Sequence, residues 1–351
     1  MQACRMVGRG QAIFQTVSEP HATDTEVIVR PQRLGVCATD LHVLYHGALV
    51  KESDLPLTLG HEFMGEVVEV RGGPRPAAYP KIREPIDIGT RVAVEPLVPC
   101  MHCVQCMQGR LNLCVRMTHL GISRDGCFAE YVSVPVSRVV PLPDEVSDSA
   151  GALIEVFACG VNFIDKARME PGDICVVVGA GPAGLVTVQC ALAAGAGAVY
   201  VLEPVPERRE LAQLCGAAEV FSTPEEAHAS VMEATGATGA DVVFECVGNS
   251  SAVNEAIHLA RKGGRVVLVG IPTGPINIDS EPIVVGELDV VGAFASSWDF
   301  DRAIAWTVSG QIKPEFIITS EVPFSDSIHA LETALRDLTE CKIQVAMPNV
   351  R

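Results

Sequence analysis

The sequence predicts an α/β protein with two domains, the first rich in β-strands and the second built on a doubly wound parallel sheet. The 351 residues suffice for two domains of roughly 100–200 residues each. Up to about residue 150, short alternating runs stand between glycines and prolines, a pattern typical of all-β structure. From about residue 172, strand-like and helix-like stretches alternate, which predicts parallel strands joined by helices.

The strands expected in the first domain are short and separated by turn residues. They cover residues 26–30, 65–70, 91–94 and 129–134. Residues 71–88 hold several prolines and charged side chains, so we expect an exposed loop without secondary structure there.

The second domain is expected to alternate buried strands with helices. Helical stretches at 207–215 and 251–261 stand between β-branched runs, which favours a parallel sheet. The predicted strands are residues 174–178, 198–203, 219–221, 241–246, 265–270 and 288–294.

The end of the chain is expected to return to the first domain. Residues 299–310 and 326–338 are amphipathic and predict helices, and the apolar tail at 342–347 predicts a strand. The predicted domains are therefore residues 1–153 together with 296–351, and residues 154–295.

The charge balance argues against nucleic acid and membranes as partners. With 43 acidic and 26 basic residues the net charge is −17, which repels phosphate backbones and anionic lipids. Residues 174–202 carry no charge, but their five glycines and Pro182 favour a buried strand–helix–strand unit over a membrane span. The N-terminus has no apolar run of signal-peptide length, so we expect a cytoplasmic protein.

Four of the thirteen cysteines are clustered in a pattern that indicates a structural zinc site. They are Cys100, Cys103, Cys106 and Cys114, and four thiolates close the coordination sphere of Zn²⁺ and leave no position for substrate. A redox Cys-x-x-Cys pair and chance spacing are the alternatives. Because the total is odd and nine cysteines are scattered, a disulfide framework is not expected.

A glycine-rich turn predicts a dinucleotide site. Gly179-x-Gly181-x-x-Gly184 follows a predicted strand and opens a helix, and Glu203 ends the next strand, 19 positions beyond the last glycine. The acidic residue favours NAD over NADP, while the nearby Arg208 and Arg209 keep NADP open. A glycine turn in an α/β protein that binds no dinucleotide is the remaining alternative. The residues expected to contact the cofactor are Gly179, Gly181, Pro182, Ala183, Gly184, Glu203 and Arg208.

A third set of residues combines the ligand types of a catalytic zinc ion. Cys37 and the neighbours His61 and Glu62 are competent ligands, as is Glu155, and three protein ligands with one open position define such a site. Read singly, Cys37 would be a small core residue, His61 a core histidine and Glu155 half of a salt bridge.

With the three motifs in this order, the sequence resembles the zinc-containing medium-chain alcohol dehydrogenase family along essentially its whole length. The resemblance implies a GroES-like catalytic domain formed by both ends of the chain, a Rossmann domain for NAD, and an active site in the cleft between them. The family motifs G-x-C-x-T-D and G-H-E match Cys37, His61 and Glu62. Glutamate at position 155 places the chain with the sorbitol, butanediol and threonine dehydrogenase-like branch.

The resemblance also implies a mechanism. Zinc acidifies a substrate hydroxyl, and Thr39 accepts its proton and passes it through the nicotinamide ribose hydroxyls to His42. His42 has two alternative roles, as a contact of the cofactor phosphate or as a surface residue. Whether Glu62 or Glu155 binds the metal directly stays open, with one expected close and the other at longer range.

These inferences predict an NAD-dependent oxidoreductase for a small-molecule substrate. Its reaction would interconvert a secondary hydroxyl of a polyol, diol or cyclitol-like compound with the ketone. A threonine-type or simple secondary-alcohol dehydrogenase, and a non-catalytic dinucleotide-binding protein, are the alternatives. The family resemblance further implies a homo-oligomer, a dimer or tetramer.

Overall fold

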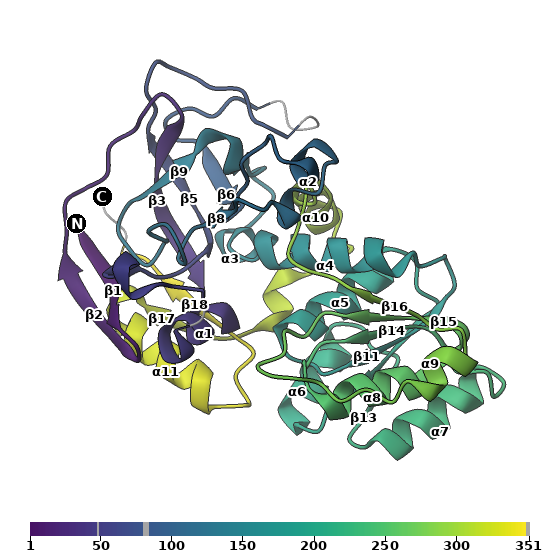
Figure 1. Cartoon of the computed structure of the whole chain (residues 1–351). Coiled ribbons are helices and arrows are strands. Elements are labelled where there is room, and N and C mark those ends of the chain that lie inside the picture. Colours follow the sequence, from purple (N-terminus) through teal and green to yellow (C-terminus); the bar gives the residue numbers. More distant parts are fainter. Residues whose placement is uncertain (48, 80–83, 349–351) are drawn as a thin grey trace. The chain divides into compact units, whose positions relative to one another are not determined.

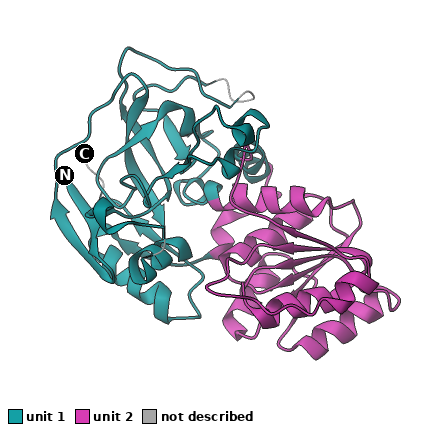
Figure 2. Ribbon diagram, viewed as in Figure 1, with its two compact units in different colours: residues 1–155, 300–308, 318–351 teal, residues 156–299, 309–317 magenta. Residues whose placement is uncertain are grey.

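The computed structural model describes residues 1–47, 49–79 and 84–348, and these form two compact units. Unit 1 comprises residues 1–155, 300–308 and 318–351, and unit 2 comprises residues 156–299 and 309–317 (Figure 2). No helix among the described residues has the length and apolarity required to cross a bilayer.

Unit 1 is built on sheets whose strands are mostly antiparallel. Its largest sheet has the order β10-β6-β5-β3-β18-β17, with β9 paired to β3, and a smaller one has the order β2-β1-β4 (Figure 1). The expectation of a β-rich first domain is confirmed. The strands are β1 (Gln2–Gly8), β2 (Gln11–Thr16), β3 (Glu26–Gly35), β4 (Leu57–Thr58), β5 (Glu62–Glu69), β6 (Arg91–Val94), β7 (Leu97–Val98), β8 (Thr118–His119), β9 (Val132–Pro135), β10 (Val139–Pro141), β17 (Ile318–Pro323) and β18 (Lys342–Ala346).

The last strand of the chain completes the main sheet of unit 1. The apolar tail returns to this unit as a strand, as expected, and β18 pairs antiparallel with β3 and parallel with β17. Its insertion places residues from the two ends of the sequence side by side. The helices of unit 1 are α1 (Ala38–His46), η1 (Glu52–Asp54), α2 (Val104–Met107), η2 (Leu111–Leu113), η3 (Val136–Arg138), α3 (Asp148–Gly151), α10 (Phe300–Val308), η5 (Phe324–Asp326) and α11 (Ser327–Arg336).

The described part of the segment predicted as an exposed loop at 71–88 contains no helix or strand, as expected, but the expectation of full exposure is wrong because two of its side chains are buried. Arg75 and Ile86 exchange two backbone hydrogen bonds, of 2.9 Å and 2.7 Å, and Ile86 is fully buried. Residues 80–83 lie outside the described residues.

A buried tyrosine explains why this segment folds back onto the unit. Tyr79 is 1% exposed, and its hydroxyl donates a 2.9 Å hydrogen bond to Glu95 Oε2, which also accepts from Arg138 at 2.6 Å. The proline content suggested an exposed loop. Burial of the Tyr79 ring is favourable, and its hydroxyl finds a buried acceptor, so this part of the segment packs against the unit.

Unit 2 contains a parallel sheet of the order β13-β12-β11-β14-β15-β16, as the alternation of strands and helices predicted. Helices α4 and α5 cover one face, and α7, α8 and α9 lie on the other (Figure 1). The elements are α4 (Ile154–Ala167), β11 (Ile174–Val178), α5 (Pro182–Ala193), β12 (Ala198–Leu202), α6 (Pro206–Leu214), β13 (Glu219–Phe221), α7 (Pro224–Ala234), β14 (Ala240–Glu245), α8 (Ser250–Leu259), β15 (Ala260–Leu268), α9 (Glu281–Val285), β16 (Asp289–Gly292) and η4 (Pro314–Ile317).

The order of the strands in unit 2 indicates where a ligand would bind. The strand order reverses between β11 and β14, and ligands of open α/β sheets bind outside the carboxyl ends of the strands at such a point.

Residues 309–317, assigned by sequence to the first domain, belong to unit 2. Gln189 holds them there, because it exchanges hydrogen bonds of 2.7 Å and 3.3 Å with the backbone of Lys313.

Candidate metal centres and dinucleotide loop

The four clustered cysteines come together in a small lobe around α2. Their sulfur atoms all lie within 4.8 Å of one another, and Cys103 Sγ is 3.5 Å from Cys106 Sγ and 3.9 Å from Cys114 Sγ. Zn–S bonds of about 2.3 Å in a tetrahedron place sulfurs roughly 3.8 Å apart. The spacing therefore fits a closed four-thiolate zinc site.

The protonation of the lobe also suits a metal. A backbone hydrogen bond from His102 lowers the pKa of Cys100 to about 5, and one from Cys106 lowers the pKa of Cys103. Burial and hydrogen bonds with its neighbours raise the pKa of Cys106 to about 12. Because thiols bind Zn²⁺ as thiolates, metal binding at this lobe would release the protons that its thiols hold.

A second cluster brings together Cys37, His61 and Glu62, whose ligand atoms also lie within 4.8 Å of one another. Strand pairing places them, because Gly35 at the end of β3 is opposite Glu62 at the start of β5. A Cβ atom on Gly35 would lie 2.3 Å from Glu62 Oε2, so the close approach requires glycine. Three residue types able to bind zinc therefore come together at one location, where His61 and Glu62 are buried and Cys37 is partly exposed.

Asp40 orients two of these ligands. Its Oδ1 is 3.1 Å from His61 Nδ1, and its Oδ2 accepts a 3.0 Å hydrogen bond from the Cys37 backbone N–H. The contact places the proton on Nδ1 and leaves Nε2 of His61 for a metal, an arrangement common in zinc sites. Burial opposes protonation of His61, but Asp40 and Cys37 outweigh it and raise its pKa well above the usual value.

Lys342, the first residue of β18, neutralises Glu62. Its Nζ donates to both Glu62 carboxylate oxygens, at 2.9 Å and 2.7 Å, and to the Val36 carbonyl at 3.1 Å. Both side chains are at most 2% exposed. Burial disfavours the ammonium, but Glu62 and Cys37 raise the pKa of Lys342 above its usual value, so the pair is ionic.

A neutral histidine packs against the same cluster. The His119 ring contacts the His61 ring edge-on, with centroids 5.1 Å apart, and its Nδ1–H donates to the Leu120 carbonyl. Burial lowers the pKa of His119 to about 3, with His61 acting in the same direction. A neutral imidazole therefore lies beside the metal ligands.

The other residues expected at the catalytic site lie on two helices. Thr39 and His42 are on α1, which begins directly after Cys37, and burial and His46 lower the pKa of His42. Glu155 lies in the first turn of α4, outside the group of ligand atoms formed by the other three residues.

The glycine-rich turn has the geometry of a dinucleotide loop. Gly179 follows β11 with φ 95°, and α5 begins at Pro182 with Gly181 as its N-cap. A Cβ atom on Gly184 would lie 1.9 Å from the Gly179 carbonyl oxygen, so this position excludes a side chain. The turn leaves the helix N-terminus available to a phosphate group.

Glu203 and two arginines surround this turn. The Glu203 carboxylate accepts hydrogen bonds from Ala180 N–H at 2.7 Å and Val205 N–H at 2.9 Å, and thereby ties the loop to the end of β12. Arg209 Nη1 donates to the Glu203 carbonyl at 2.9 Å. A Cβ atom on Gly181 would lie 4.0 Å from Arg208 Nη1, so this guanidinium reaches the loop.

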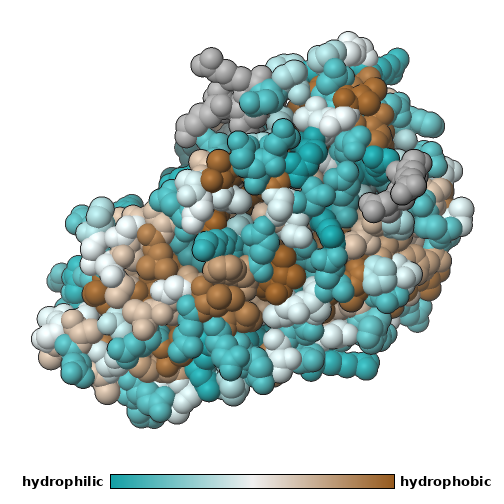
Figure 3. All heavy atoms as spheres, turned by 180° about the vertical axis from the view of Figure 1, so that it is seen from behind, coloured by the Kyte–Doolittle hydropathy of each residue, from teal (hydrophilic) through white to brown (hydrophobic). Residues whose placement is uncertain are grey.

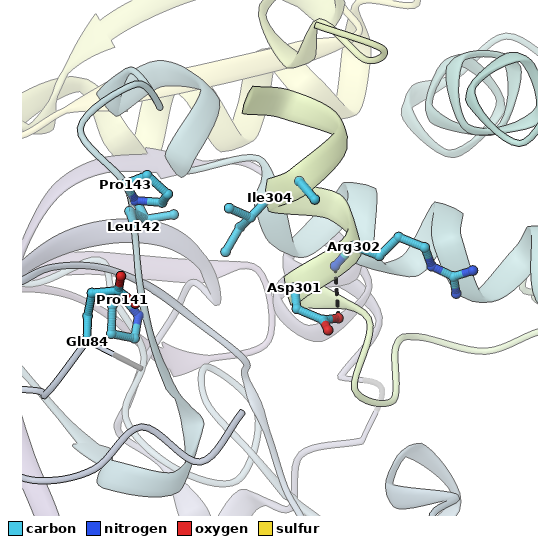
Figure 4. Close-up of a pocket in the computed structure, with 8 residues that line it drawn as sticks. Glu84, Pro141, Leu142, Pro143, Asp301, Arg302 and Ile304 are labelled. Carbon is cyan, nitrogen blue, oxygen red and sulfur yellow. Dashed lines mark hydrogen bonds between the residues drawn. The ribbon is translucent and has the colours of Figure 1, made fainter. Parts of the chain in front are cut away.

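A pocket of about 430 Å³ in unit 1 is separate from both metal clusters. Figure 4 shows Asp301 and Arg302 from α10 on one side and Pro141 to Pro143 on the other, and Asp301 accepts a 2.8 Å hydrogen bond from the Arg302 backbone. None of the cysteine, histidine or glutamate ligands lines it, so the metal chemistry lies elsewhere in the unit.

Sequence reasoning missed three residues at the Cys37 cluster. Asp40 stands in the motif with Cys37, so its spacing was a signal for an orienting role. Lys342 and His119 are brought in by strands distant in sequence, and no local pattern indicated them.

The fold and these sites define a class, the zinc-dependent dehydrogenases that use a nicotinamide dinucleotide. Family models agree, with residues 23–144 matching the alcohol dehydrogenase GroES-like domain and residues 182–309 the zinc-binding dehydrogenase model. The chain belongs to the zinc-containing medium-chain alcohol dehydrogenase family, which confirms the resemblance and the oxidoreductase class.

Similar proteins span nearly the whole chain. A sorbitol dehydrogenase of Bacillus subtilis is 31% identical over 99% of this chain and 98% of its own. An L-galactonate-5-dehydrogenase of Escherichia coli is 32% identical over 87% of each chain. The crystal structure of 2R,3R-butanediol dehydrogenase from Bacillus subtilis superposes with a TM-score of 0.88, at 30% identity and 99% coverage of both chains.

Proposed function

We propose that this protein oxidises a secondary hydroxyl of a polyol, diol or cyclitol-like compound to the ketone, with NAD as hydride acceptor. The observation that carries the proposal is the cluster of Cys37, His61 and Glu62, in which Lys342 neutralises the charge of Glu62. The relatives named for sorbitol, galactonate and butanediol support a substrate with several hydroxyls.

Cys37 and His61 would hold the catalytic zinc ion, with Glu62 close and Glu155 able to replace it. The donor set of thiolate, imidazole and carboxylate suits Zn²⁺, and Asp40 fixes the histidine tautomer. Because Lys342 neutralises Glu62, a bound zinc ion keeps positive charge. When bound, zinc acidifies a hydroxyl and the oxidised nicotinamide accepts hydride.

Thr39 and His42 would remove the substrate proton. Both are on α1, which is anchored next to the metal ligands by Cys37 at its start. The lowered pKa of His42 keeps its imidazole neutral at physiological pH, so that it accepts a proton rather than holding one.

The glycine loop and Glu203 would bind the dinucleotide, with NAD preferred. The helix N-terminus at Gly181, Pro182, Ala183 and Gly184 suits the pyrophosphate, and the Glu203 carboxylate repels a 2′-phosphate. Arg208 near the loop would contact the cofactor phosphates or ribose.

A cytoplasmic homo-oligomer is proposed as the working form. All thirteen cysteines lie outside disulfides in the structure, which suits a reducing compartment. Figure 3 shows apolar patches among hydrophilic residues on one face, and in unit 2 Val284 and Val285 are 74% and 63% exposed. Light scattering after gel filtration would give the oligomeric state.

The proposal is tested by NADH formation from zinc-loaded protein and NAD. The panel contains sorbitol, xylitol, myo-inositol, 2,3-butanediol, threonine and 2-propanol, with Cys37→Ser as the inactive control. Turnover of a polyol or diol that is lost in the control supports the proposal. Turnover restricted to threonine or 2-propanol would overturn the substrate assignment, and no turnover at all would overturn the catalytic one.

A further inference from the structure

Helix α1 carries two histidines on one face. His42 and His46 are four residues apart, so their side chains are neighbours on the helix surface. Their ring centroids are 5.6 Å apart and the rings are inclined by 37°. The inner ring is half-buried and the outer one is exposed. One water molecule between the rings would therefore connect a proton on the inner ring with a second imidazole.

The outer histidine opens onto a pocket. His46 lines a cavity of about 660 Å³ together with the chain around Met6 to Arg9 and around Val50 to Pro56. The end of α1 is fixed, because the N–H of Gly47, in the left-handed conformation with φ 64°, donates to the carbonyls of His42 and Val43. The cavity gives the ring access to solvent without a change in the helix.

The charged groups around this pair are few and of both signs. Arg9, Lys51 and Glu52 line the pocket with His46. On α11, packed beside α1, Glu332 and Arg336 act in opposite directions on Tyr45. Burial lowers the pKa of His42, and the charge of His46 lowers it further, so the two imidazoles interact electrostatically.

We propose that His46 is the second station of the proton path, which carries a proton from His42 to the solvent in the pocket at the end of α1. A ring nitrogen of His42 releases the proton to a ring nitrogen of His46, which gives it to buffer base. No other bond changes. The inference rests on the proposed function, since His42 must first receive the substrate proton.

The experiment compares the full-length zinc-loaded protein with His46→Gln, which keeps length and helix propensity but has no basic nitrogen. The control is His21→Gln, whose side chain is 84% exposed and lies near Glu69, not on α1. NAD and 2,3-butanediol are mixed rapidly with each protein in weak buffer. NADH absorbance reports hydride transfer, and a pH indicator reports proton release.

In His46→Gln, we expect proton release to slow on the order of ten-fold and added imidazole to restore it. The His21→Gln control should match wild type. Equal rates of proton release in all three proteins would overturn the relay. Absence of NADH from wild type with every alcohol of the panel would instead overturn the proposed function, and the relay with it.

A titration by NMR tests the coupling of the rings without turnover. Removing His46 removes its repulsion of a proton on His42, so the pKa of His42 should rise in His46→Gln. A role for His46 as a mere helix-end residue predicts an unchanged His42 titration, and this result would contradict the proposal.

Discussion

Both carboxylate oxygens of Glu62 accept hydrogen bonds from Lys342, at 2.9 Å and 2.7 Å, although the two residues lie 280 positions apart. If Cys37 bound a metal as a thiolate, an uncompensated carboxylate beside it would concentrate negative charge at the proposed site. The ammonium cancels the charge of Glu62, so that a zinc ion bound there by one thiolate would keep a net positive charge and would act as a strong Lewis acid.

Substitution of Lys342 by methionine should destabilise the protein by about 3–5 kcal/mol, because it leaves Glu62 buried and unpaired. Denaturant unfolding of wild type and variant measures the loss. Lys342→Arg, which keeps the charge, is the matched control. In a Glu62→Gln background the same substitution should cost much less, and equal costs in both backgrounds would show that the ion pair is not the cause.

Substitution of Asp40 by asparagine should weaken catalytic zinc binding by about 10–100-fold. The side-chain amide keeps the shape of Asp40 but loses the charge that holds the Nδ1 proton of His61. Competition with a chromophoric chelator measures the zinc affinity of the proposed catalytic site. Asp54→Asn, in an exposed 3-10 turn, should leave that affinity unchanged. Unaltered affinity in Asp40→Asn would refute the orienting role.

Metal analysis should find two zinc ions per chain, one for each ligand cluster. Cys106→Ser should lose the ion of the cysteine lobe and keep the other, since the lobe and the Cys37 cluster share no ligand. The variant should also unfold at lower denaturant concentration, because zinc bound only to the folded lobe stabilises it. Retention of both ions in Cys106→Ser would exclude the four-thiolate site.

Glu203→Ala should lower the ratio of kcat/KM with NAD to kcat/KM with NADP at least about ten-fold. The substitution removes the charge that repels a 2′-phosphate, and it also frees the N–H groups of Ala180 and Val205. Steady-state rates with each cofactor measure the ratio. Glu207→Ala on the neighbouring helix serves as control. An unchanged ratio would mean that Glu203 holds the glycine loop in place but does not select between the two cofactors.

The acid limit of activity set by His42 should lie below pH 6.5, the ordinary value for histidine. Its lowered pKa keeps the proton-accepting neutral form populated to lower pH. The same shift makes the free energy of unfolding depend on pH, because the unfolded chain binds this proton at a higher pH than the folded protein does. Stability from His42 is therefore present above about pH 6.5 and is lost as pH falls toward the folded pKa. An NMR titration of His42 in wild type, with His42→Gln for assignment, checks the direction.

Much of the fold followed from local patterns. The strands β11 and β13 have the bounds expected from β-branched runs, and β18 returns to unit 1 as the apolar tail at 342–347 indicated. The segment at 71–88 has no helix or strand among its described residues, as its prolines indicated, but proline content does not show whether Tyr79 finds a buried acceptor, so its partial burial was not predicted.

The sequence by itself determined the ligand types, their order and the class of chemistry. Cys37, His61 and the four lobe cysteines are recognisable because metal ligands must be of a few residue types at short spacings. Only the tertiary structure decided how these ligands are supported. Lys342 reaches Glu62, and His119 reaches His61, through strand pairing across long separations. Such contacts depend on sheet register, which a local pattern does not encode.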